Sequence, residues 1–585
     1  ASLETGEPQD YAPILSKGMA LFEDLGCHGC HAVENYPALA KLDTSGPSLG
    51  KVGSKVNGVD WIARWIKDPR SYLPKTKMPR LFPTDGMTKV VYFKDGAKRS
   101  GVVSQAADGI ILQTDDGTQY PYPESAVDRI VDEVKSIAAF LEQMKDATLD
   151  GVSSEFSTSP EVIAAGAEIV KTVGCLACHS VDGLGNDFAP NLDGVGSKVT
   201  PNFLRQWIRD PKSYDAKTVM PSLRLTDKEI DSIVAYLMSR KEAAPSPTVT
   251  VATYGNLTEE IHPKVGEGLI RTYGCFGCHN IPGFENESKV GAELGAFGAK
   301  TVEEFDFGDT VGIEHTWDGW AIGKLTNPRR YQTRRIISRM PVFSQLAENE
   351  ENARALAALL KSFQPDQYPL SYIPQLSEKA SRIDTGRRLI KKYNCKGCHE
   401  IEETGGQFVD VIAAYKGLDG IEAQRYAPPK LQAEGVKVYP EWLFSFLKHP
   451  TPIRYGLQVR MPTFGLPDND ATTIVEYFSA LSDAPFPYET IAMQPPTPTE
   501  LKTGKQLFEA LECTSCHPKQ GEVIPIGSDK TGRPDLSLAK QRLRADWIIE
   551  WLKNPQKFQP GTAMPQYWLE IGGTYDSQLP EIVDG

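Results

Sequence analysis

Ten cysteines fall into five copies of the pentapeptide C-x-x-C-H, with none left over. The cysteine pairs are Cys27 and Cys30, Cys175 and Cys178, Cys275 and Cys278, Cys395 and Cys398, and Cys513 and Cys516. The histidines that follow them are His31, His179, His279, His399 and His517. C-x-x-C-H is the attachment motif for c-type haem. Its thiols form thioethers to the haem, and its histidine is the proximal iron ligand. The chain is therefore predicted to carry five covalent haems, with haem iron as its metal.

Other chemistries of paired cysteines fit this pattern less well. A C-x-x-C pair can form half of a zinc site or a redox-active dithiol. Five copies, each followed directly by histidine, favour haem over both alternatives. A disulfide framework is disfavoured, because C-x-x-C spacing rarely suits structural bridges in a chain of this size.

A methionine followed by proline recurs once after each motif. These methionines are Met78, Met220, Met340, Met461 and Met564. Methionine usually fills gaps in a core, and that interpretation suits Met19, Met144 and Met238, which fall in helical patterns. A thioether on a proline-fixed loop instead suits the sixth ligand of a haem iron. We expect each repeat to supply its own histidine–methionine pair.

Two predicted helices frame every motif. The first carries a glycine nine residues before the motif, at Gly18, Gly166, Gly266, Gly386 and Gly504. Glycine inside a helix costs about 1 kcal/mol relative to alanine, so its recurrence predicts that another helix crosses there. The second helix carries an aromatic residue eight positions before a proline, at Trp61, Phe203, Trp320, Trp442 and Trp547.

The repeats differ at their ends. Residues 89–122 alternate apolar and polar around three Asp-Gly pairs, which predicts a small antiparallel unit of about four strands. It could dock a partner or cover a haem edge. Amphipathic helices are predicted near 127–144, 227–242, 350–363 and 469–481, and none closes the fifth repeat. We expect either that the natural chain continues or that a partner supplies the missing surface.

Composition restricts the function classes. The net charge of −13 disfavours nucleic-acid binding and favours a partner with a basic docking face. No apolar run approaches the ~18–20 residues of a membrane span. The chain begins at Ala1 without methionine, as a processed, exported protein would. Since c-type haem is attached outside the bacterial cytoplasm, a periplasmic or other extracytoplasmic location is expected.

The order of helix, C-x-x-C-H, loop, aromatic helix and Met-Pro resembles the class I (cytochrome c-like) haem domain. The resemblance implies a mainly α fold of five tandem domains. Their predicted ranges are 1–147 (with the β insertion at about 88–123), 148–245, 246–368, 369–487 and 488–585, called repeats one to five below. In this family a P-x-L proline carbonyl accepts a hydrogen bond from the proximal histidine. The resemblance therefore pairs Pro47 with His31, Pro190 with His179, Pro429 with His399 and Pro534 with His517, and Ala292 with His279.

Histidine and methionine together leave an iron no open position, so we expect an electron carrier or electron-transfer subunit rather than a catalyst in its own right. The predicted partners are redox proteins, including a membrane quinol-oxidising complex or a terminal oxidase of a respiratory chain. The alternatives are a haem oxidoreductase with one open iron site and a polymerising extracellular electron conduit. Of the other histidines, His28 is predicted at the surface and His449 at a helix end. Arginines near Met340 are expected to pair with haem propionates or a neighbouring domain.

Overall fold

The computed structural model describes residues 12–577 apart from 34–45, 74–75, 83–88, 115–116, 151–153, 242–251, 309–311, 313, 332–339, 365–375, 487–494, 519–521, 526, 560–561 and 572–573. Roughly half of the described residues are helical. The chain divides into two compact units. Unit one comprises Ala1–Glu155, Gly194–Arg205 and Arg240–Leu376, and unit two comprises Phe156–Asp193, Gln206–Ser239 and Ser377–Gly585. None of the described helices is long and apolar enough to cross a membrane.

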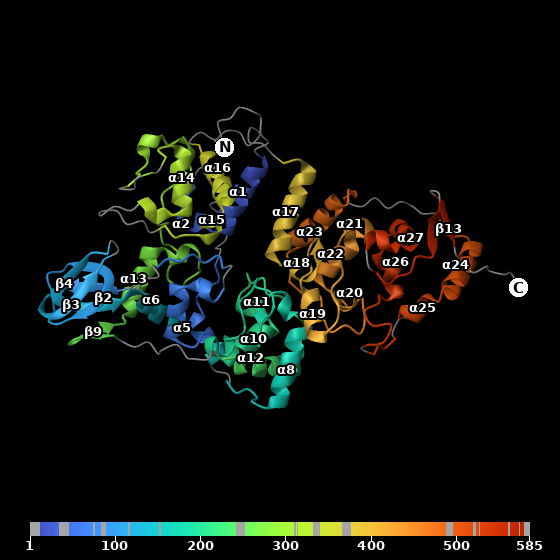
Figure 1. Cartoon of the computed structure of the whole chain (residues 1–585), viewed down its shortest axis with the longest axis horizontal. Helices are drawn as coiled ribbons and strands as arrows, with labels where there is room; N and C mark the ends of the chain where they lie inside the picture. The colour runs from blue at the N-terminus through green and yellow to red at the C-terminus, as the bar shows by residue number, and fades with distance from the viewer. Residues whose placement is uncertain are drawn as a thin grey trace. The chain divides into compact units, whose positions relative to one another are not determined.

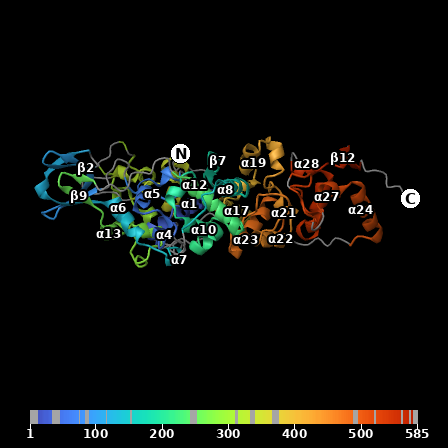
Figure 2. The same cartoon turned by 90° about the horizontal axis from the view of Figure 1, so that it is seen from below.

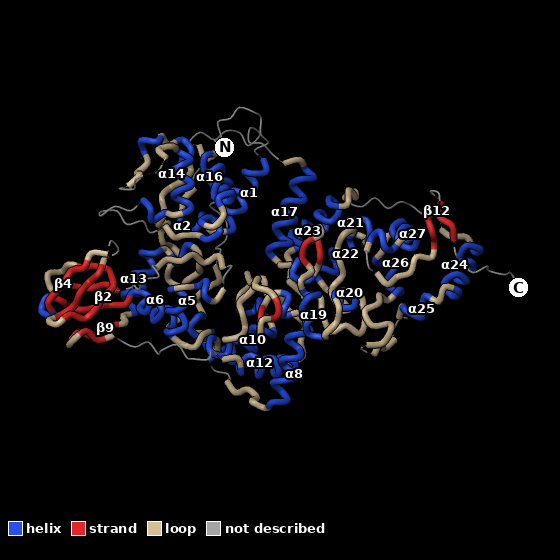
Figure 3. Tube along the Cα trace, viewed as in Figure 1, coloured by secondary structure: helices blue, strands red, loops and turns tan. Residues whose placement is uncertain are grey.

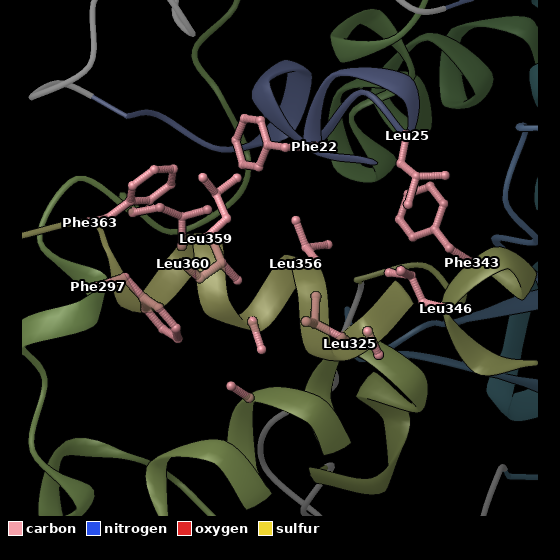
Figure 4. Close-up of a cluster of buried hydrophobic side chains, with 14 of the residues drawn as sticks. Phe22, Leu25, Phe297, Leu325, Phe343, Leu346, Leu356, Leu359, Leu360 and Phe363 are labelled. Carbon is pink, nitrogen blue, oxygen red and sulfur yellow. The ribbon is translucent and has the colours of Figure 1, made fainter. Parts of the chain in front are cut away.

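Helices of repeats one and three pack on each other in unit one. Helix α1 (Ala12–Asp24) lies on α16 (Glu350–Lys361), as Figure 1 shows, and α13 (Pro263–Tyr273) lies on α6 (Glu133–Glu142), as Figures 1 and 2 show. The core between α1 and α16 is drawn in Figure 4, where Phe22 of α1 faces Leu359 and Phe363, and Leu25, just after α1, lies beside Phe343. Each of these pairs joins one helix of repeat one to one helix of repeat three.

The β insertion is larger than predicted. Its four predicted strands are present as β1 (Lys89–Phe93), β2 (Lys98–Ala106), β3 (Gly109–Gln113) and β4 (Gln119–Pro123). They belong to a seven-stranded sheet of order β4-β3-β2-β1-β5-β9-β8, drawn in red in Figure 3. The three further strands are β5 (Val127–Asp132), β8 (Thr253–Tyr254) and β9 (Leu257–Glu260). The prediction of a small four-stranded unit was therefore wrong in extent, since β8 and β9 come from far along the chain.

A buried carboxylate joins the insertion to β9. The side chain of Glu259 is fully buried and lies 2.8 Å from Lys89 Nζ and 2.9 Å from Lys135 Nζ. Burial alone would lower the pKa of Lys89, but its hydrogen bonds to Glu259 and Tyr254 raise that pKa above its ordinary value. The lysine therefore stays charged at neutral pH, and its contribution to stability is lost only when the pH rises through the raised pKa.

Replacing Glu259 by alanine is expected to lower the free energy of unfolding by about 3 kcal/mol, because the partly buried Lys89 loses its counter-ion and Lys135 keeps only Asp132, at 3.7 Å. The measurement is urea unfolding of the full chain. The neighbouring Glu260 is exposed, and Glu260→Ala is the matched control, with an expected change within about 0.5 kcal/mol. Equal losses in the two variants would show that the buried ion pair does not stabilise the sheet.

Two further helix pairs lie in unit two. Helix α8 (Pro160–Thr172) packs on α12 (Asp227–Ser239), and α17 (Glu378–Lys392) packs on α23 (Asp468–Leu481). Repeat five contributes α24 (Pro498–Ala510), and its last described element is a hairpin of β12 (Trp568–Ile571) and β13 (Thr574–Ser577). The aromatic helices are present in every repeat, as α5 (Val59–Lys67), α10 (Pro201–Arg209), α14 (Trp317–Thr326), α22 (Pro440–Lys448) and α27 (Ala545–Lys553).

The recurrent glycine marks a helix crossing in four repeats. A methyl group added at Gly18, Gly166 or Gly266 would lie 2.0–2.3 Å from a backbone carbonyl oxygen of the crossing helix, and one at Gly386 would lie 2.2 Å from the Cβ of Tyr477. The prediction of close packing is confirmed at these positions. It was wrong at Gly504, where nothing lies within 4 Å, because no crossing helix is described in repeat five.

The predicted terminal helices are confirmed at α12, α16 and α23. Near Val127 the prediction was half wrong, because residues 127–132 form β5 and only 133–142 form α6. The apolar side chains of Val127, Ile130 and Val131 fit helical spacing equally well. Pairing with β1 and β9 decides in favour of the strand.

Candidate haem-binding sites

In every motif, the ring Nδ1 of the proximal histidine is hydrogen-bonded to a backbone carbonyl oxygen. Nδ1 lies 2.7–2.9 Å from the oxygen of one loop residue in every motif, with these pairs: His31 and Ala292, His179 and Pro190, His279 and Pro47, His399 and Pro429, and His517 and Pro534. This bond fixes the ring and leaves Nε2 for a metal ion. The recurrence in all five motifs indicates one shared role.

Two of the predicted carbonyl partners are exchanged. The predictions for His179, His399 and His517 are confirmed. Those for His31 and His279 were wrong, because His31 bonds Ala292 of repeat three and His279 bonds Pro47 of repeat one. The acceptor is a backbone oxygen in both loops. The identity of the residue, proline or alanine, therefore does not determine which histidine it binds.

Burial controls the protonation of the motif side chains. It raises the pKa of Cys27, Cys175, Cys275 and Cys395 to about 12, so these thiols are protonated in the apoprotein. Burial likewise lowers the pKa of four proximal histidines, His31, His279, His399 and His517, although each carbonyl bond acts in the opposite sense. A neutral imidazole is the form that ligates a metal.

The Met-Pro loops of unit one lie against the motifs. Met340 and Cys27 pack on the same buried apolar cluster. Met78 accepts a hydrogen bond to Sδ from Trp65 Nε1 at 3.0 Å, and Trp65 and Cys275 pack together on a second cluster.

In unit two the predicted ligands of repeats four and five line one continuous cavity of about 1580 Å³. Its walls include His399 and Met461 of repeat four and His517 and Met564 of repeat five. The loop of Met220 pairs with the loop of Met461 through an antiparallel bridge between Ser222 and Thr463. The structure thus brings histidine and methionine together around one space in repeats four and five.

Buried cations and indole N–H groups lie beside these sites. The ammonium of Lys198 lies 4.6 Å from the ring of Trp61 and 5.3 Å from that of Trp65, and it has no carboxylate partner among the described residues. Burial, and then the charge of Lys55, lower the pKa of Lys198 to about 7. In unit two, Lys437 lies over Trp547 and Arg542 lies over Trp442.

These groups fit the anionic edge of a haem. The indole Nε1 atoms of Trp61, Trp317 and Trp547 are buried with no hydrogen-bond partner among the described residues. Buried donors and cations are expected to have acceptors. The propionates of haem are carboxylates that such donors bind, and the apolar walls suit the macrocycle.

Sequence reasoning missed these cations, although a signal was present. Val-Gly-Ser-Lys occurs verbatim at 52–55 and at 195–198, and a basic residue stands five or six positions before the aromatic residue in four repeats. The four are Lys55, Lys198, Lys437 and Arg542. A repeated lysine before an aromatic helix indicates a shared anionic ligand.

Motifs of different repeats touch each other. In unit one, a methyl group on Gly29 would lie 2.0 Å from the carbonyl oxygen of Gly277. In unit two, Asn394 Nδ2 donates to the Ala177 carbonyl at 3.0 Å and to Cys178 Sγ at 3.2 Å. The first motif therefore adjoins the third, and the second adjoins the fourth.

This contact also explains His28, whose predicted surface position was wrong. Its side chain is 4% exposed, and the third motif packs against the adjoining Gly29. His449 is exposed at the end of α22, as predicted. Of the arginines near Met340, Arg329 donates to the carbonyl of Leu81 at 3.0 Å. Arg334, Arg335 and Arg339 lie outside the described residues.

Comparison with known proteins identifies the class of domain. Residues 163–241 and 501–584 match the family model of cytochrome c. The chain therefore contains cytochrome c domains in these two ranges, which implies that it binds c-type haem.

The individual relatives are named as subunits of an oxidase and of a reductase. One is a subunit of the nitric oxide reductase of Stutzerimonas stutzeri, which is 29% identical over 87 residues, or 14% of this chain and 60% of that protein. Cytochrome c oxidase subunit 2 of Alkalihalophilus pseudofirmus is 30% identical over 106 residues, which are 16% of this chain and 31% of that protein. The chain thus spans less than two thirds of either relative. No solved structure matches. Together these matches indicate haem-based electron transfer.

Proposed function

We propose that the chain is a pentahaem cytochrome that relays electrons through five covalent haems, each ligated by one histidine and one methionine. The observation that carries the proposal is the histidine–carbonyl bond of 2.7–2.9 Å, which recurs at every motif. Five rings held in this way, each beside two cysteines, form five equivalent attachment sites.

The chain's own residues prepare these sites for electron transfer. When bound, haem supplies one-electron chemistry at iron. The carbonyl bond orients each imidazole and makes it a stronger donor. A methionine on a loop fixed by proline would be the second ligand of the iron without proton transfer, since a thioether has no proton to lose. Apolar walls such as those of the 1580 Å³ cavity exclude water and limit the reorganisation that a change of charge requires.

Adjacent sites support a relay. The first and third motifs are in contact in unit one, and the second and fourth are in contact in unit two. Repeats four and five share one cavity. Spatial order therefore departs from chain order, and each site has a neighbour to exchange electrons with.

The relatives point to the partner class. We propose a membrane respiratory complex, such as a terminal oxidase or a quinol-oxidising complex, as donor or acceptor, because the relatives are named as oxidase and reductase subunits. The net charge of −13 suits a basic docking face. We place the protein outside the cytoplasmic membrane, where c-type haem is attached.

Haem content and carbon monoxide binding test the proposal. The purified protein is expected to hold five covalent haems by mass and by pyridine haemochrome assay, and to bind no carbon monoxide when reduced at neutral pH. Met220→Ala is the control that opens one iron, and it is expected to bind one equivalent. Fewer than five haems would overturn the relay as proposed. Binding to the unaltered protein would favour an oxidoreductase with an open iron, and filaments seen by microscopy would favour an extracellular conduit.

A further inference from the structure

The loop and helices of repeat one pack on the motif and helices of repeat three, and those of repeat three pack on repeat one. This exchange determines which methionine lies beside each motif. We propose, on the basis of the proposed function, that Met340 ligates the haem attached at Cys27 and Cys30. Met78 then ligates the haem attached at Cys275 and Cys278. Each of these two sites takes its histidine from one repeat and its methionine from the other.

Backbone hydrogen bonds around the motifs give the first argument. In repeat two, the loop returns to its own motif through bonds from Ala189 N to Cys178 O and from Leu192 N to Ser180 O, both 2.8 Å. In unit one, the same bonds cross between repeats. The crossed bonds are Gly46 N to Cys278 O at 2.8 Å, Leu49 N to Asn280 O at 2.9 Å, Gly291 N to Cys30 O at 2.7 Å and Leu294 N to Ala32 O at 2.8 Å. Each loop therefore closes over the motif of the other repeat.

The helix crossings give the second argument. In repeat two, Gly166 of α8 meets Ser232 of α12, so both helices belong to one repeat. In unit one, Gly18 of α1 meets Ala355 of α16, from repeat three. Gly266 of α13 meets Ser136 of α6, from repeat one, with a methyl-to-oxygen distance of 2.0 Å. The helix that leads into each motif therefore packs on a helix of the other repeat, just as the motif itself is covered by the loop of the other repeat.

The side chains next to each methionine give the third argument. In repeat four, Phe464 stands three residues after Met461 and lies 5.6 Å from the ring of Tyr393, two residues before the motif. The residues at the corresponding positions in unit one pair across repeats. Phe343, after Met340, shares a cluster with Leu25 and lies beside it in Figure 4.

On the other side of unit one, Phe82 follows Met78 by four residues and lies 4.7 Å from the ring of Tyr273, before the third motif. The Met340 loop thus covers the first motif, and the Met78 loop covers the third. The two loops also pair with each other through an antiparallel bridge between Arg80 and Val342. Each methionine therefore lies next to the attachment motif of the other repeat.

Variants that lack one of the two haems test directly which methionine ligates which iron. In Cys27→Ala/Cys30→Ala the first haem is absent, and the partner methionine of that haem has nothing to ligate. Adding Met340→Ala is then expected to create no carbon monoxide-binding haem, whereas adding Met78→Ala is expected to create one per chain. Crossed ligation is overturned if Met78→Ala creates no carbon monoxide-binding haem in this background and Met340→Ala creates one. Met220→Ala in the same background is the matched control and opens one iron under either pairing.

The reciprocal background covers a failure of the first to mature. In Cys275→Ala/Cys278→Ala, Met340→Ala is expected to create one carbon monoxide-binding haem and Met78→Ala none; the reverse overturns the pairing. Failure of the proposed function looks different, because the unaltered protein would then lack haem at these motifs or bind carbon monoxide itself.

Discussion

Gly266→Ala is expected to lower the free energy of unfolding by about 3 kcal/mol. The added methyl group would lie 2.0 Å from the carbonyl oxygen of Ser136, which is helix backbone and cannot move aside as a side chain can. Overpacking of a core costs about 1–3 kcal/mol when neighbours adjust, and here α13 and α6 must separate. The measurement is the urea midpoint of the holoprotein, followed by far-ultraviolet circular dichroism.

Gly504→Ala is the matched control, at the same position of repeat five. Nothing lies within 4 Å of the added methyl group, and Gly504 does not have a positive φ. Alanine is the better helix former, so this variant is expected to be unchanged or stabilised by up to about 1 kcal/mol. If the two variants lost stability equally, helix propensity rather than the crossing would explain the recurrent glycine.

The local elements of this fold could be predicted from the sequence because their causes are local. Proline ends the aromatic helices, as at Pro69 after α5 and Pro450 after α22. The Asp95-Gly96 turn joins β1 to β2, with Gly96 at φ 85°. Attachment motifs and Met-Pro loops likewise depend on spacings within one repeat.

The exchange between repeats could not be predicted, because both partners satisfy the same chemistry. Pro47 and Ala292 each offer a backbone carbonyl, and Gly18 and Gly266 each require a crossing helix. The sequence of a single repeat does not indicate whether its own loop and helix or those of another repeat will pack on its motif. The choice is made by contacts distant in sequence, such as that between Gly29 and Gly277.

The buried cations escaped prediction for a related reason. Lys198 and Lys437 look like ordinary lysines at the ends of short helices. Their role depends on a neighbouring repeat, which places an aromatic ring beneath the ammonium group. Burial of a cation that no described carboxylate offsets, as at Lys198, is visible only in three dimensions.

Met461→His is expected to lower the reduction potential of one haem by on the order of 0.2 V, because imidazole stabilises oxidised iron more than a thioether does. For a one-electron couple ~59 mV is tenfold in the equilibrium constant, so this shift exceeds a thousandfold. Repeat four adjoins the second motif through Asn394 and shares its cavity with repeat five. Electrons that cross unit two would therefore face an uphill step in the middle of their path.

Spectroelectrochemical titration should resolve one shifted haem and four unchanged ones, and electron transfer through unit two should slow. Met238→Leu is the matched control, because Met238 is 5% exposed in α12 and no proline follows it. Its expected shift is close to zero. Should Met461→His leave every potential in place, Met461 is not an iron ligand. A shift of all five haems together would instead indicate a global change of structure, so the ligand assignment rests on the effect being confined to one.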